Sequence, residues 1–86
     1  MSLAAPPVHA YITQSPSICD GEPIISGTRI TVRAIVHYIL FHGMTAEELV
    51  KEFPHINLSQ VYDALSYYYD HKAEIESLIA ENSKLR

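Results

Sequence analysis

The stretch from Thr45 to His71 constrains the fold of this chain more than any other, because its residues follow the rules for two consecutive helices. Thr45 is followed three residues later by Glu48, and this spacing predicts a capping box, in which each side chain bonds to the backbone N–H of the other residue. Pro54 has no N–H and disfavours helical angles at the residue before it. The first helix is therefore predicted over residues 45–53.

Asn57 and Gln60 repeat the capping spacing and predict the start of a longer helix that runs to His71. A short helix, a tight turn and a longer helix form the layout of a helix-turn-helix. The helical period predicts an inward stripe on the second helix, made of Val61, Ala64, Leu65 and Tyr68. The outward positions are then Ser59, Gln60, Asp63, Ser66, Tyr67 and Asp70.

Two further helices are predicted around this corner. Thr31 is placed to cap a helix from Val32 to His42, and Gly43 is placed to end it in the left-handed conformation. Residues 72–82 form an amphipathic helix with Ile75, Leu78 and Ile79 on one face. No Pro or Gly lies near His71, so this segment either starts a separate helix or continues the preceding one.

Short β-favouring segments precede the helices. A brief strand is plausible within Val8 to Thr13, and Ile24-Ile25 follows as a second one. Asp20-Gly21 between them is a tight-turn dipeptide, since both residues tolerate positive φ. These β-arms pair either within the chain or with a second chain.

The length and charge of the chain limit what it can do. With 86 residues there is room for one domain, predicted over residues 11–82, with a mobile segment 1–10 and a frayed end 83–86. The net charge of −4 counts against tight nucleic-acid binding by the chain alone. The single Cys19 cannot form an intrachain disulfide, and no apolar run reaches the length of about 18 residues that a membrane span needs. We therefore expect a cytoplasmic protein.

Several motifs carry a family likeness. They are the segment Pro16 to Ile30 with Gly27-Thr28-Arg29 inside it, the turn Gly43-Met44-Thr45, and the corner Phe53-Pro54-His55-Ile56. Together they resemble the bacterial domain-of-unknown-function four-three-three family, whose members look like antitoxins of the VapB forty-five type. The resemblance implies a mainly α protein with a homeodomain-like three-helix helix-turn-helix core, short N-terminal β-arms and an extra C-terminal helix. It also implies pairing with a PIN-like ribonuclease.

Four residues are candidates for DNA contact. Arg29 and Arg33 flank the start of the helix that begins at Val32. A positive charge there opposes the helix dipole, so neither arginine is present to stabilise the helix. The charge of each arginine is predicted to contact either a phosphate or a carboxylate of a partner. For Arg29 the alternative is that it attaches the β-arm through carbonyls or through an acid such as Asp63 or Asp70. Ser59 and Gln60 start the longer helix, where such residues can reach base edges.

Aromatic residues are the candidates for a protein interface. Tyr38 and Phe41 lie off the apolar stripe of their helix, and Tyr67, Tyr68 and Tyr69 spread around another helix too widely to enter one small core. Tyr68 follows the inward stripe, so Tyr38, Phe41, Tyr67 and Tyr69 are predicted to contact another chain. The alternative is that the last helix covers the tyrosines.

No catalytic or metal-binding motif is visible. His37 and His42 lie five residues apart, whereas two ligands share a face of an α-helix at a spacing of four. No nucleophile–base order, carboxylate pair or glycine-rich phosphate loop can be read. We expect no enzyme activity, no metal and no cofactor.

The sequence thus predicts a non-catalytic antitoxin-like module that forms a homodimer and binds a toxin nuclease, with DNA autoregulation as a secondary activity. The alternative is a stand-alone, sequence-specific transcription regulator that uses Arg29, Arg33, Ser59 and Gln60.

Overall fold

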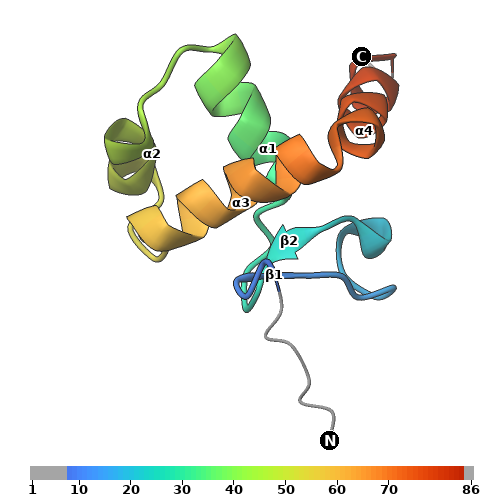
Figure 1. The fold of residues 1–86 in the computed structure, drawn as a ribbon, viewed down its shortest axis with the longest axis horizontal. Helices are drawn as coiled ribbons and strands as arrows, with labels where there is room; N and C mark the ends of the chain where they lie inside the picture. Colours follow the sequence, from blue (N-terminus) through green and yellow to red (C-terminus); the bar gives the residue numbers. More distant parts are fainter. Residues whose placement is uncertain (1–7, 85–86) are drawn as a thin grey trace, which may run out of the picture.

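The computed structural model describes residues 8–84. Within this range four α-helices follow a small two-stranded sheet (Figure 1). The longer helix of the predicted corner, α3, lies at the centre, where α1, α2, α4 and β1 all contact it. In chain order the elements are β1 (Ile12–Thr13), the 3-10 turn η1 (Cys19–Gly21), β2 (Ile24–Ile25), α1 (Val32–Val36), the π-helical turn η2 (His37–Phe41), α2 (Ala46–Glu52), α3 (Leu58–Asp70) and α4 (Lys72–Lys84).

Both predicted capping boxes are confirmed. The Thr45 hydroxyl oxygen accepts the Glu48 N–H at 3.0 Å, and a Glu48 carboxylate oxygen accepts the Thr45 N–H at 2.9 Å. Asn57 and Gln60 make the same reciprocal pair at 3.0 and 2.8 Å. Each box satisfies backbone donors that the first turn of a helix leaves without partners, so both helix starts are specified locally.

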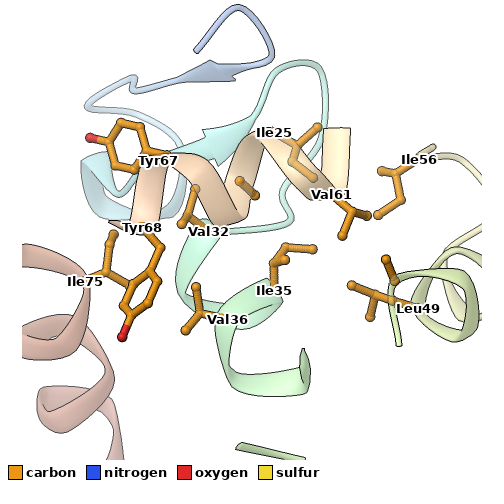
Figure 2. Packing of buried hydrophobic residues seen from close by; sticks show 12 residues of the cluster. Ile25, Val32, Ile35, Val36, Leu49, Ile56, Val61, Tyr67, Tyr68 and Ile75 are labelled. Atoms are coloured by element: carbon orange, nitrogen blue, oxygen red, sulfur yellow. The ribbon is translucent and has the colours of Figure 1, made fainter. Parts of the chain in front are cut away.

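The core lies between the inner face of α3 and α1. Val61 and Ala64 of α3 are fully buried, and so are Val32, Ile35 and Val36 of α1. Figure 2 shows Val61 in one cluster with these three α1 residues. Leu49 of α2 and Ile75 of α4 close the cluster at its two ends. The predicted inward stripe is confirmed for Val61, Ala64 and Tyr68, and Leu65 is half-buried.

The β-arms pair with each other within the chain. β1 and β2 are antiparallel, with Ile12 opposite Ile25 and Thr13 opposite Ile24. Residues 26–31 turn the chain back from β2 to α1, and the Pro23 carbonyl accepts the Val32 N–H at 2.9 Å. Ile24 and Ile25 are buried, so the sheet forms one wall of the core.

The predicted α-helix over Val32 to His42 is only partly correct. It is α-helical to Val36 and then widens into the π-helical turn η2, where the His42 N–H bonds to the His37 carbonyl at 3.0 Å. The predicted end is confirmed, since Gly43 has a φ of +75°.

α3 and α4 are separate helices. His71 lies between them with φ −131° and ψ 45°, outside the helical region. The Tyr68 hydroxyl donates to a Glu76 carboxylate oxygen at 2.8 Å across the break and fixes α4 against α3. α4 continues to Lys84, beyond the end predicted at residue 82, because nothing in its sequence breaks the helix there. The remaining predicted frayed residues, 85 and 86, lie outside the described range, as do residues 1–7 of the predicted mobile segment.

The fold is mainly helical with a small sheet, consistent with the predicted helix-turn-helix class. Within residues 8–84, none of the helices has the length and apolar content that crossing a bilayer requires.

Truncating a core leucine should destabilise the protein strongly. Leu49 is fully buried, and Leu49→Ala should lower the free energy of unfolding by about 2–5 kcal/mol through lost burial and a residual cavity. Leu40 is 43% exposed, and Leu40→Ala is the matched control, expected to change stability by less than about 0.5 kcal/mol. Urea unfolding of both variants measures the difference. Equal effects would contradict the described core.

Alkaline pH should weaken the contact between α3 and α4. The hydrogen bond to Glu76, with burial, raises the pKa of Tyr68 from 10.0 to about 12. The folded state holds this proton more tightly than the unfolded chain, so the contribution of Tyr68 to stability is full below pH 10 and is lost as pH rises toward 12. Urea unfolding at a series of pH values should show this loss. Tyr68→Phe has no titrating hydroxyl and should lose less stability over the same range; an identical profile would exclude this role of Tyr68.

Candidate protein and nucleic-acid interface

One side of α3 stays exposed because the other side is packed on α1. The exposed residues recur at helical spacing, and we call them the outer face of α3: Leu58, Ser59, Tyr62, Ser66, Tyr69 and Asp70. Tyr62 and Tyr69 are 53% and 59% exposed, one helical repeat of seven residues apart. Their rings therefore lie along the same strip of surface, with Ser66 between them. An exposed aromatic strip of this kind favours contact with another protein.

The predicted outward position of Tyr67 is wrong. Its side chain is only 9% exposed, and in Figure 2 it projects from α3 toward the β-arm side, while Tyr68 projects toward Ile75. The Tyr67 ring stacks on His71 at 4.2 Å between ring centroids and meets the edge of His9 at 5.2 Å. Burial, with the charge of Glu74, raises the pKa of Tyr67. Tyr67 therefore belongs to the packing of the N-terminal arm.

His9 attaches this arm to α3. Its Nδ1 lies 3.2 Å from an Asp63 carboxylate oxygen, and its Nε2 lies 2.8 Å from an Asp70 carboxylate oxygen. Asp63 also accepts the Tyr11 backbone N–H at 2.8 Å. The His9 ring thus links both carboxylates of α3 to the N-terminal arm. The attachment considered for Arg29 through Asp63 or Asp70 is thus made by His9 instead.

The two candidate arginines lie apart from the outer face of α3. Both line a hollow of about 460 Å³ next to α1, which Ser59 and Gln60 do not line. The Arg33 guanidinium makes a two-pronged salt bridge to Glu22, at 3.0 and 3.2 Å, inside the same chain. Arg29 is exposed and forms no ion pair with the described residues. The structure therefore does not unite the four predicted DNA contacts in one surface.

The outer face of α3 lacks the charge that DNA binding needs. α3 contains no Lys or Arg, and the amide oxygen of Gln60 is used in the capping box. α2 places Glu47, Glu48 and Glu52 at the surface beside Lys51. Of the predicted pair, Ser59 is exposed and takes no part in the capping box, whereas Gln60 is half-buried and forms it. Phosphate binding draws mainly on Lys and Arg, so this surface is a poor match for a duplex.

The remaining predicted interface residues differ in exposure. Phe41 on η2 is 58% exposed, as the prediction requires. Tyr38 is half-buried and packs against Phe53, with 5.8 Å between the ring centroids. Neither residue lies on α3, so Phe41 marks a second exposed apolar position, next to Leu40.

Comparison with known proteins identifies the family. Residues 12–68 match the family model described as "Protein of unknown function (DUF433)". The chain belongs to the DUF433 family. A crystal structure of a DUF433 member protein from Anabaena variabilis is similar to it, with 30% sequence identity and a TM-score of 0.77 over 81% of this chain and 68% of that one. No curated protein matches the chain.

Within this DUF433 protein, sequence reasoning missed three surface features. Tyr62 and Leu58 were left out of the outward set, although a period of 3.6 residues places Tyr62 next to Ser59 and Ser66. His9 was left without a role, because its partners lie 54 and 61 residues away. The helical period could have revealed Tyr62, but no local signal points to the contacts of His9.

Removing the His9 imidazole should loosen the N-terminal arm. His9→Ala deletes two hydrogen bonds to charged groups, each worth about 1.5–3 kcal/mol when well formed and less at an exposed partner such as Asp70. Hydrogen exchange at the Tyr11 amide should quicken by about tenfold or more. His55→Ala, at an exposed histidine outside the arm, is the control and should leave this amide unchanged. Unaltered Tyr11 exchange in the His9 variant would refute the attachment.

Proposed function

We propose that this protein is a non-catalytic, antitoxin-like module that uses the outer face of α3 to bind a partner protein, a PIN-like ribonuclease. The observation that carries the proposal is the exposed strip of Leu58, Tyr62 and Tyr69 on a helix that has no cationic residue. Tyrosines bury large areas at low entropic cost, and they are common at the centres of interfaces.

Charge supports the same partner. The chain has a net charge of −4, and Glu47, Glu48 and Glu52 of α2 are exposed. A ribonuclease must attract an anionic backbone, so its groove is positively charged. An acidic surface that carries aromatic anchors would associate with such a groove rapidly and specifically, and would block it.

DNA binding enters this proposal as a property of the complex. The outer face of α3 supplies the exposed Ser59 but no phosphate-binding cation, and Arg33 is held by Glu22. A cationic partner would provide the missing charge. The isolated chain should therefore give no shift of its own upstream DNA at physiological salt, whereas tight binding by the isolated chain would favour the stand-alone regulator instead.

The direct experiment is co-expression with the product of the adjacent gene. The proposal expects the two proteins to purify together, and it expects this chain to restore growth that the neighbouring product suppresses. If the two proteins do not associate and growth is not restored, the antitoxin-like role is wrong.

The double variant Tyr62→Ala, Tyr69→Ala tests the surface itself. Losing two central aromatic anchors should weaken partner binding by about 100-fold, since each such anchor contributes more than about 1 kcal/mol. Phe41→Ala removes an aromatic ring of similar exposure from η2 and is the matched control. Titration calorimetry compares the dissociation constants. A larger loss with Phe41→Ala than with the double variant would place the interface elsewhere.

A further inference from the structure

The π-helical turn η2 brings two histidines together. On an α-helix, residues five apart point about 140° away from each other. In η2 the His42 N–H bonds to the carbonyl five residues back, and this wider turn places residues five apart on the same face. The His37 and His42 rings accordingly lie with their centroids 4.6 Å apart and their planes at 77°. The spacing that excluded a metal pair on an α-helix therefore favours one here.

The ring separation suits a shared metal ion. Zinc binds imidazole nitrogen at about 2.0–2.1 Å, and two imidazoles on one tetrahedral zinc have their centroids about 5 Å apart. Neither ring forms a side-chain hydrogen bond within residues 8–84, so their nitrogens are available. The Phe41 ring centroid lies 5.4 Å from that of His37, and the Tyr38 centroid lies 6.2 Å from that of His42, so aromatic rings flank both imidazoles.

The pair is an incomplete site within one chain. Among the described residues no group of three or more His, Cys, Asp or Glu side chains could hold a metal ion, so two positions of a tetrahedral ion have no ligand. Leu40 and Phe41 on the same turn are 43% and 58% exposed. A second copy related by a two-fold axis would present the same two imidazoles and bury these apolar side chains. A divalent cation would also offset the repulsion between two chains of net charge −4.

We propose that His37 and His42 chelate a divalent transition-metal ion, with zinc as the best match, and that the same pair from a second copy completes the site. The result is a metal-linked homodimer that meets at η2. The inference specifies how the homodimer expected from the sequence forms, and it does not depend on toxin binding. The η2 contact leaves the outer face of α3 available to a partner, because α3 turns its inner face toward α1 and η2 follows α1.

The experiment uses the full, tag-free chain and zinc alone, without any toxin partner. Titration calorimetry measures uptake, and light scattering after size exclusion measures mass with and without zinc. We expect one zinc per two chains and a doubled mass. His37→Ala and His42→Gln should each lower zinc affinity by about tenfold or more and abolish the dimer. His55→Ala, at an exposed histidine outside the pair, should change neither.

Each alternative result has a defined meaning. No zinc uptake, or uptake that the two variants leave unchanged, would overturn the chelate. One zinc per chain without a change in mass would overturn the shared site. Circular dichroism of the variants should match the unaltered chain, since His42 is exposed and His37 half-buried. Failure here leaves toxin binding untouched, and failure of toxin binding leaves the zinc titration unchanged, so the two proposals are separable.

Discussion

Burial of the inner face of α3 is the interaction on which the rest of the structure depends. α3 contacts α1, α2, α4 and β1, so the position of each of these elements depends on its packing against this one helix. Val61 and Ala64 are inaccessible to solvent, and burial of a side chain the size of Val61 contributes about 1.5–3 kcal/mol. A chain of 86 residues has little apolar area to spare. It covers one side of α3 and leaves Tyr62 and Tyr69 on the other side in contact with water.

The parts of the fold that follow from sequence are those determined by neighbouring residues. Thr45 with Glu48, and Asn57 with Gln60, form reciprocal caps across three residues, and no distant contact is needed to place them. Gly43 ends η2 because its left-handed conformation is strained for residues with a Cβ. The inward stripe of α3 follows from the helical period. In each case the physical cause lies within one or two turns of helix, so a single sequence contains it.

The features that sequence reasoning missed depend on distant residues or on helix geometry. Tyr67 lies at an outward angle by helical period, yet the arm that carries His9 folds over it and buries it. Arg33 meets Glu22 because the chain turns back after β2 and the Val32 N–H bonds to the Pro23 carbonyl, which brings the neighbouring residues together. The π-helical turn changes which residues share a face of the helix, and no pattern of residues in His37–Phe41 predicts such a turn. Tyr69 and Phe41 are exposed as expected, and the helical period also accounts for the exposure of Tyr62. The contacts of His9 and the closeness of His37 and His42 depend on packing and on the π-helical turn.

The helix-turn-helix layout suggests DNA binding, whereas the charges on the molecule do not favour it. A helix-turn-helix binds DNA when its exposed helix is flanked by cations that hold the phosphates. Here α3 itself contains no Lys or Arg, and Lys72 just after it places its Nζ 5.8 Å from the centre of the Tyr69 ring. Asp63 and Asp70 both pair with His9, and the Arg33 guanidinium pairs with Glu22. The pairing of Asp63 and Asp70 with His9 does not turn them into phosphate ligands. A carboxylate accepts hydrogen bonds, whereas a phosphate needs hydrogen-bond donors. The exposed side of α3 is aromatic and carries little charge. Its burial against another protein is favourable, because it removes apolar area from water.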